Sequence, residues 1–228
     1  MLYIACAVLW LLRFALGASI FSFLGVVIWR LPRGESVVKG RSHCCGARIP
    51  ARDFWLEVLG GGGVCACCAA FGGETARAAL SFAVLGILTV VAFMDIDTLE
   101  IYDRFPALLL VCGAAAQFVF PGPGIKSRLL GCVIVSLPML LLALVVPGGF
   151  GGGDIKLMFG AGFFLGARLT VVAAFLGILL GGGFGALLLA AKKADRKTRF
   201  AFGPFLCIGI AAAMFFGERL ADWYIGLL

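Results

Sequence analysis

Runs of apolar residues, separated by short polar stretches, recur along the whole chain. Eight such runs lie at about 8–29, 58–73, 78–94, 105–120, 128–146, 155–167, 169–191 and 203–225. A helix that crosses a membrane needs about 20 mostly apolar residues, and most of these runs come near that length, 155–167 being the shortest. The pattern therefore predicts an all-α, polytopic membrane protein with about eight transmembrane helices in a single membrane domain, 1–228.

The composition strengthens this prediction. Hydrophobic residues make up 62% of the 228 residues and charged residues 14%, whereas soluble domains are about half apolar and a quarter charged. A soluble globule, a disordered chain and a secreted disulfide scaffold are thereby excluded. The first run lacks a preceding basic segment and a small-residue cleavage site, so we interpret it as a retained span. The glycine runs 60–63 and 181–183 either weaken their helices or allow close helix packing in lipid.

The positive charges predict an orientation. Thirteen of the 19 Lys and Arg residues fall on one side of the predicted spans and five on the other. Because Lys and Arg concentrate on the cytoplasmic side of membranes, the N-terminus is expected outside. The inside loops are then 30–57, 95–104, 147–156 and 192–200. Loop charge of this kind is a topology signal, so the net charge of +7 gives no reason to expect nucleic acid as a partner.

Two aspartates stand at the boundaries of apolar runs on the predicted cytoplasmic side. Asp95 follows the run 78–94 directly, and Asp154 follows three glycines and precedes the run 155–167. If the fold brings them together, the two carboxylates share one proton, which is the chemistry of aspartic proteases. If it does not, both are solvated carboxylates that end their helices. The residues alone leave both interpretations open.

Four short motifs, in order along the chain, make a family resemblance visible. They are Arg30-Leu-Pro-Arg-Gly-Glu35, Asp95-Ile-Asp-Thr-Leu-Glu-Ile-Tyr-Asp103, Gly151-Gly-Gly-Asp-Ile-Lys-Leu157 and Phe202-Gly-Pro-Phe-Leu206. They resemble the R-L-P-x-G-E, D-x-D/E-x-x-x-I-P-D, GxGD-x-K-L and F-G-P-F-L segments of the type IV prepilin peptidases, which are GxGD membrane aspartic proteases. Tyr102 stands where proline is usual.

The resemblance implies a function and a set of site residues. The catalytic residues implied are Asp95 and Asp154. The supporting residues implied are Asp97, Asp103, Gly151, Gly153 and Lys156. We expect Lys156 to extend its ammonium group to the membrane interface, and the glycines to bend the backbone out of a helix so that Asp154 faces a cavity.

The substrates implied are type IV prepilins or pseudopilins, whose basic leader is cleaved at the cytoplasmic face of the cell inner membrane. The apolar stem of such a substrate stays in the lipid bilayer. We expect acidic residues of the chain to contact the basic leader; the candidates are Glu35, Asp97, Glu100 and Asp103. The oligomeric state stays open.

The loop 30–57 departs from the family pattern. Family members carry a longer cytoplasmic insert with two Cys-x-x-Cys pairs suited to zinc, whereas here Cys44 and Cys45 are adjacent remnants, with His43 as a third candidate ligand. Another alignment completes a four-cysteine site with the cysteines of 65–68. Because 58–73 is uncharged and follows Glu57, we interpret it as a span and predict no bound metal.

This shortened loop bears on a second activity. Fuller family members also methylate the new N-terminus with S-adenosylmethionine, and the shortening argues against methyl transfer in this chain. So does Gly25, which stands where the family often has asparagine. Peptidase chemistry needs only the two aspartates and no cofactor.

Three alternative functions make other demands on the sequence. An archaeal-type preflagellin peptidase has the aspartates but lacks the first and last of the four motifs. A small transporter predicts inverted repeats and acids near the centres of spans, neither of which is apparent. A catalytically inactive assembly scaffold has no need to retain both aspartates.

Overall fold

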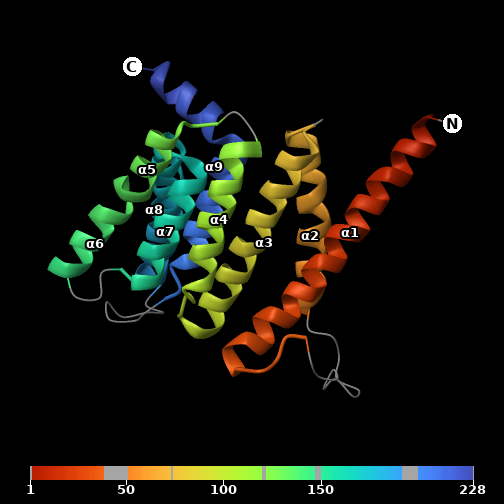
Figure 1. Cartoon of the computed structure of the whole chain (residues 1–228). Helices are drawn as coiled ribbons and strands as arrows, with labels where there is room; N and C mark the ends of the chain where they lie inside the picture. Colours follow the sequence, from red (N-terminus) through yellow and green to blue (C-terminus); the bar gives the residue numbers. More distant parts are fainter. Residues whose placement is uncertain are drawn as a thin grey trace. The chain divides into compact units, whose positions relative to one another are not determined.

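The computed structural model describes residues 2–38, 51–72, 74–119, 122–146, 150–191 and 200–227, and in these residues the chain is helical with no β-strand (Figure 1). The helices are α1 (Leu2–Arg30), α2 (Ala51–Ala70), α3 (Thr75–Thr98), α4 (Arg104–Val119), α5 (Ile125–Ile134), α6 (Ser136–Val145), α7 (Gly152–Leu165), α8 (Ala167–Ala190) and α9 (Gly203–Ile225), with a 3-10 turn, η1 (Leu31–Arg33), after α1. Each predicted apolar run thus corresponds to a helix, α5 and α6 sharing the run 128–146.

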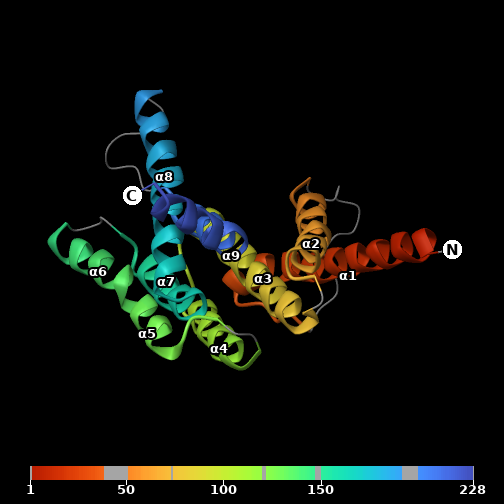
Figure 2. The ribbon, with the colours of Figure 1, turned by 90° about the horizontal axis from the view of Figure 1, so that it is seen from above.

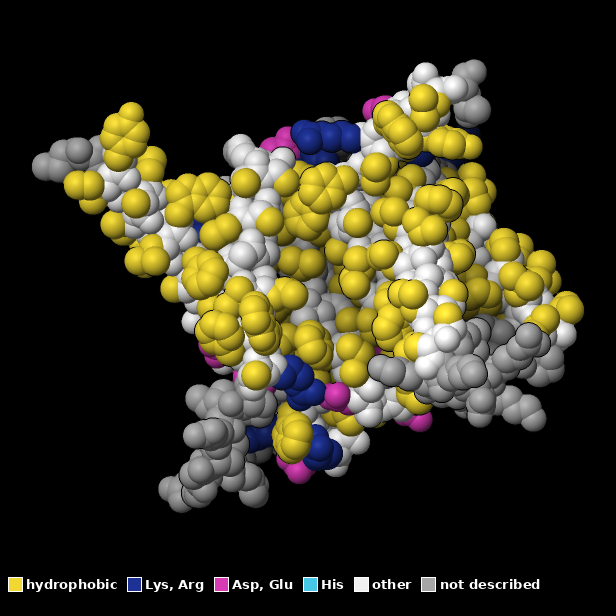
Figure 3. Space-filling model, turned by 180° about the vertical axis from the view of Figure 1, so that it is seen from behind, with side chains coloured by type: hydrophobic (Ala, Val, Ile, Leu, Met, Phe, Trp, Pro, Cys, Tyr) yellow, Lys and Arg dark blue, Asp and Glu magenta, His cyan; other side chains and the backbone are white. Residues whose placement is uncertain are grey.

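The helices fit a multi-pass membrane protein. Six stretches of the described chain are long and apolar enough to cross a bilayer, namely α1, α2, α3, α5 with α6, α8 and α9. Helices α4 and α7 are shorter, with 16 and 14 residues. Hydrophobic side chains cover the helices on the face shown in Figure 3, and charged side chains gather toward their ends. The all-α, polytopic prediction is confirmed.

A break at Val135 separates α5 from α6, where the sequence predicted one continuous span. The cause is Pro138, which has no N–H to donate and whose ring crowds the carbonyl of Ile134 one turn earlier. Helix α5 accordingly ends at Ile134, and α6 begins at Ser136.

Contacts divide the chain into two compact units, Met1–Gly86 and Ile87–Leu228, with the division inside α3. The expectation of one membrane domain, 1–228, stays a prediction. In the first unit, α1 packs on α2 where Gly17 lies against Gly60, and a Cβ on either glycine would collide with the carbonyl oxygen of the other. Helix α2 runs unbroken through its four glycines, so here the close-packing interpretation is confirmed.

The first motif forms a turn that ends α1. Gly34 has a φ of +68°, a conformation that suits glycine, and the N–H of Glu35 donates to the carbonyl of Arg30 over 3.1 Å. The guanidinium of Arg33 lies 3.5 Å from the centre of the Trp29 ring. Residues 39–50 lie outside the described chain. Because α2 begins at Ala51, the last part of the predicted loop 30–57 is helical.

In the second unit α7 occupies the centre. It contacts α4, α5, α6, α8 and α9 (Figure 2), and its buried residues lie around the whole helix. A helix that is apolar on all sides is buried among other helices. This position fixes the first turn of α7, which carries Asp154.

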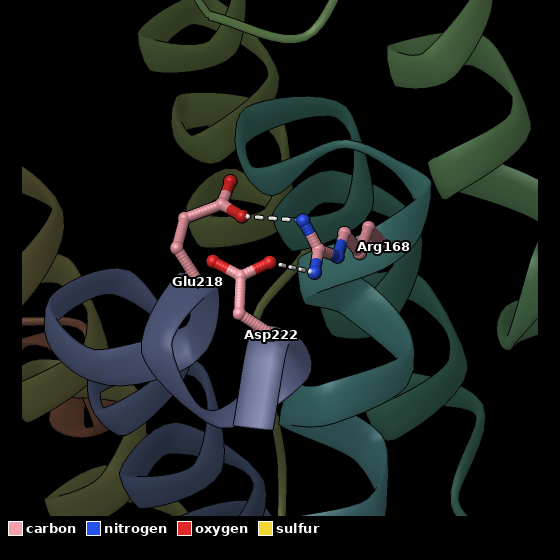
Figure 4. Close-up of polar contacts among 3 residues, drawn as sticks. All are labelled: Arg168, Glu218 and Asp222. Atoms are coloured by element: carbon pink, nitrogen blue, oxygen red, sulfur yellow. Dashed lines mark hydrogen bonds and ion pairs between the residues drawn. The ribbon is translucent and has the colours of Figure 1, made fainter. Parts of the chain in front are cut away.

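An exposed ion-pair cluster joins α8 to α9 (Figure 4). Arg168, at the start of α8, donates from Nη1 to Glu218 Oε2 over 3.0 Å and from Nη2 to Asp222 Oδ1 over 2.6 Å. The two acids lie four residues apart on α9, so their side chains leave the same face of that helix.

Arg128 is completely buried in α5, although the sequence placed it among the charges outside the membrane. Its guanidinium donates to five oxygens at 2.8 to 3.3 Å: Gln117 Oε1 and the carbonyls of Gly113, Pro123, Phe163 and Phe164. Phe163 and Phe164 are in the last turn of α7, whose carbonyls have no partner within the helix. Arg128 therefore ties α4, α5 and the end of α7 together.

Candidate active site

The first predicted catalytic residue, Asp95, lies one turn before the end of α3 and is only 6% exposed. The helix ends because Leu99 adopts a φ of +56°, while its N–H still donates to the carbonyl of Asp95 over 2.9 Å. The Thr98 hydroxyl accepts from the N–H of Glu100 over 3.3 Å, which supports the turn. Beyond it the chain passes through residues 99–103 into α4.

The second, Asp154, is the third residue of α7 and is 8% exposed. Gly151 precedes the helix in an extended conformation, whereas Gly152 and Gly153 are helical. The expectation that the glycines bend the chain out of a helix is therefore wrong for these two. Gly153 is instead required by a close approach, since a Cβ there would lie 2.7 Å from Cβ of Ile101.

Both aspartates line one cavity of about 290 Å³. Its walls are the end of α3, the segment that follows it and the start of α7. The lining residues are Asp95, Leu99, Glu100, Ile101, Tyr102, Gly151, Gly152, Gly153 and Asp154. The fold thus brings together two carboxylates that are 59 positions apart in the sequence.

The two carboxylates have different surroundings. Asp95 accepts a hydrogen bond at Oδ2 from the backbone N–H of Gly203, the first residue of α9, over 2.9 Å. Asp154 Oδ1 is buried and has no hydrogen-bond partner among the described residues. Asp154 lies just before the predicted span 155–167. Burial of its carboxyl, followed by the charge of Asp95, raises the pKa of Asp154 to about 6. Both causes favour the protonated form of Asp154.

The supporting residues are only partly at the cavity. The Nζ of Lys156 donates to both oxygens of Asp103, over 2.7 and 2.8 Å, and the extension of Lys156 to the membrane interface stays a prediction. This pair joins the segment after α3 to α7, on which Asp154 lies. Asp97 is exposed on the last turn of α3 and does not line the cavity. Of the four acidic residues expected to contact the basic leader of the substrate, Glu100 lines the cavity.

No role was predicted for Gly203, although it lies within a recognised motif. The hydrogen bond to Asp95 spans 108 positions, and no local pattern indicates such a partner. The signal that was available is the Gly-Pro pair at the start of an apolar run, which is typical of a helix N-terminus approached closely by another group.

The candidate metal ligands fall in two groups. His43, Cys44 and Cys45 lie outside the described residues, so the expectations about zinc and S-adenosylmethionine stay predictions. The cysteines at 65, 67 and 68 are free thiols within α2. No group of three metal-ligating side chains occurs among the described residues.

The geometry defines the class: an all-helical membrane protein with two buried carboxylates at one cavity. The model of the type IV leader peptidase family matches residues 82–186, and that of the bacterial peptidase A24 N-terminal domain matches residues 15–95. The two matches together cover residues 15–186, and over that range the chain is similar to the type IV leader peptidase family.

The chain is also similar to curated relatives that are named prepilin leader peptidase/N-methyltransferase. The relative from Bacillus subtilis is 29% identical over 191 residues, which cover 82% of this chain and 75% of the relative. That from Legionella pneumophila is 27% identical, with 83% and 68% covered. That from Aeromonas salmonicida is 29% identical, with 84% and 67% covered. No solved structure matches the chain significantly.

Proposed function

We propose that this protein is an aspartic endopeptidase that removes the leader peptide of type IV prepilins or pseudopilins at the cytoplasmic face of the inner membrane. The observation that carries the proposal is the shared cavity, in which Asp95 and Asp154 meet with both carboxylates buried. The loop charges support the cytoplasmic orientation, because they place the ends of α3 and α7 that bear the aspartates inside.

In the proposed reaction the two aspartates share one proton and hold a water between them. The ionised carboxylate takes a proton from the water, whose oxygen bonds to the carbonyl carbon of the scissile peptide, while the protonated carboxyl donates to the carbonyl oxygen. The tetrahedral intermediate then collapses. The C–N bond breaks as the carboxyl that took the proton from water gives it to the amine nitrogen of the apolar stem. A hydroxyl of the intermediate gives its proton to the other carboxylate, so the pair returns to its starting state with one proton.

The reaction requires no metal or cofactor. The relatives' names include N-methyltransferase, and the shortened loop 30–57 argues against that activity here. We therefore expect the new N-terminus to be released without a methyl group, also when S-adenosylmethionine is supplied.

The test is cleavage of a purified prepilin by the purified protein, comparing wild type with Asp95→Asn and Asp154→Asn. Each variant is expected to lose at least about 100-fold in rate, because general acid–base catalysis contributes roughly that much. Glu218→Gln, which changes an exposed carboxylate near the other end of α9, is the matched control. Mass spectrometry of the product reports the cleavage position and any added methyl group.

Full activity in either Asp→Asn variant contradicts the role of that aspartate. A wild-type protein that cleaves preflagellin but no prepilin supports the archaeal-type alternative. A wild-type protein that cleaves neither contradicts the proposed function and favours the scaffold or the transporter.

A further inference from the structure

The start of α9 contacts one of the two aspartates directly. The N–H of Gly203 donates to Asp95 Oδ2 over 2.9 Å, and both groups are buried. The first N–H groups of a helix have no partner within it and carry the positive end of the helix dipole, so they favour an anionic acceptor. Asp95 occupies that position at α9.

Gly203 is the residue of this turn that supplies the N–H. Pro204 has none, and the N–H groups of Phe205 and Leu206 both donate to the carbonyl of Phe202, over 3.1 and 3.3 Å. The turn is also fixed to the start of α7, because the rings of Phe150 and Phe202 pack edge to face with 5.8 Å between their centres. The donor is therefore held in place relative to both aspartates.

The structure also leaves little room for a side chain at residue 203. A Cβ on residue 203 would lie 2.7 Å from Oδ2 of Asp95, 3.1 Å from its Cγ and 3.3 Å from its Cβ. The Cβ of Asp95 is fixed by the backbone of α3, and its Cγ can move away only by a change of side-chain rotamer. Any side chain at 203 would therefore displace the carboxylate.

We propose that Gly203 is a positioning residue for the peptidase reaction: its N–H holds one oxygen of Asp95 as the anionic acceptor, and its lack of a side chain leaves that carboxylate room beside the cavity. Asp95 then takes the proton from water, and Asp154, whose Oδ1 has no partner, carries the shared proton. This inference rests on the proposed function and assigns the two aspartates different roles in it.

The first test removes the N–H without adding a side chain, by replacing residue 203 with glycolic acid, so that an ester replaces the peptide bond. The rate constant kcat for prepilin cleavage is expected to fall about 10- to 100-fold, since a hydrogen bond to a charged group is lost. KM is expected to stay unchanged, because Gly203 does not touch the substrate in this role. The acidic limb of the pH profile is expected to move to higher pH, since the anion is less stabilised.

Other titratable groups face the same region and bear on that profile. They are Asp154 on α7, Glu100 and Tyr102 in the segment after α3, and Cys207, which is one turn along α9 and interacts electrostatically with both aspartates. The profile is therefore recorded in parallel for Glu100→Gln and Cys207→Ala, so that the part of the acidic limb set by each of these groups is known.

The second test adds a side chain but keeps the N–H. Gly203→Ala is expected to lower kcat by at least the same factor. Gly183→Ala is the matched control, because a Cβ at that helical glycine meets no atom within 4 Å, and it is expected to have wild-type kinetics. Thermal unfolding of each variant in detergent separates a change in rate from a failure to fold.

A glycolate variant with wild-type kcat and a wild-type pH profile would overturn the inference. So would a fall in kcat with an unmoved acidic limb, since loss of packing alone produces that result. Both outcomes require a wild-type protein that cleaves prepilin. Absence of wild-type cleavage contradicts the proposed function instead, so the two failures are distinguishable.

Discussion

At the scale of single residues, the burial of Asp154 has a consequence for the stability of the fold. A carboxylate that ionises in a buried site beside another carboxylate destabilises the fold. The raised pKa of Asp154, about 6 against an ordinary value of 3.8, corresponds to at most about 3 kcal/mol above pH 6. Catalysis and stability thus make opposite demands on this residue.

Asp154→Asn is therefore expected to stabilise the protein while it abolishes cleavage. Ionised Asp154 destabilises the folded state, and its pKa is raised in that state. The destabilisation is therefore absent below about pH 4, grows between pH 4 and pH 6, and is complete above pH 6. The unfolding temperature of the variant in detergent should exceed that of wild type by a few degrees at pH 7.5, and the two should converge toward pH 4. Glu218→Gln, at an exposed position, should show no such pH dependence. A variant less stable than wild type at both pH values contradicts the prediction.

The two aspartates could be identified from the sequence because acids at the boundaries of apolar runs are conspicuous, and the motifs around them pointed to a family. The roles of the residues that support them were harder to predict. Lys156 pairs with Asp103, 53 positions away, and Gly153 matters because Ile101 touches it. Such roles depend on which segments pack against one another, and no short sequence pattern shows that.

At the scale of elements, the Lys156–Asp103 pair links the segment after α3 to α7. Both side chains are more than half exposed, so the pair itself contributes less than about 1 kcal/mol to stability. Its effect is on geometry, since it joins the segment that follows α3, the helix of Asp95, to α7, which bears Asp154.

Reversing either charge, with Lys156→Asp or Asp103→Lys, is expected to lower kcat several-fold through like-charge repulsion between these segments. The double exchange should restore most of the activity, which a kinetic double-mutant cycle measures. Arg168→Gln breaks the exposed cluster between α8 and α9 and should leave kcat unchanged. Additive losses in the double exchange would show that the pair does not couple the segments.

Element positions were largely predictable, because each apolar run became a helix. The break between α5 and α6 was predictable in principle from Pro138, yet the continuous run of apolar residues outweighed it. The glycines of α2 had two open interpretations, since helix weakening and close packing have the same sequence pattern. Only the partner helix, which brings Gly17 against Gly60, decides between them.

At the scale of the whole molecule, the distribution of Lys and Arg predicts a membrane topology that fusion proteins can test. Alkaline phosphatase fused after Glu35 or Glu100 is expected to be inactive, because both positions are predicted to be cytoplasmic. Fusions after Glu74 or Gly122 should be active, since those positions are predicted outside. The opposite pattern would place Asp95 on the outer face and contradict the proposed site of cleavage.

The buried guanidinium of Arg128 has a consequence for how the chain enters the membrane during synthesis. An arginine within an apolar segment opposes transfer into lipid by about 3 kcal/mol on insertion scales. Three of its acceptors, on Gly113, Gln117 and Pro123, precede it in the chain, and two, on Phe163 and Phe164, are made later. We expect α5 to remain at the translocon until α7 emerges. A nascent chain ending after Val146 should show α5 poorly integrated, and Arg128→Leu should make that integration independent of α7.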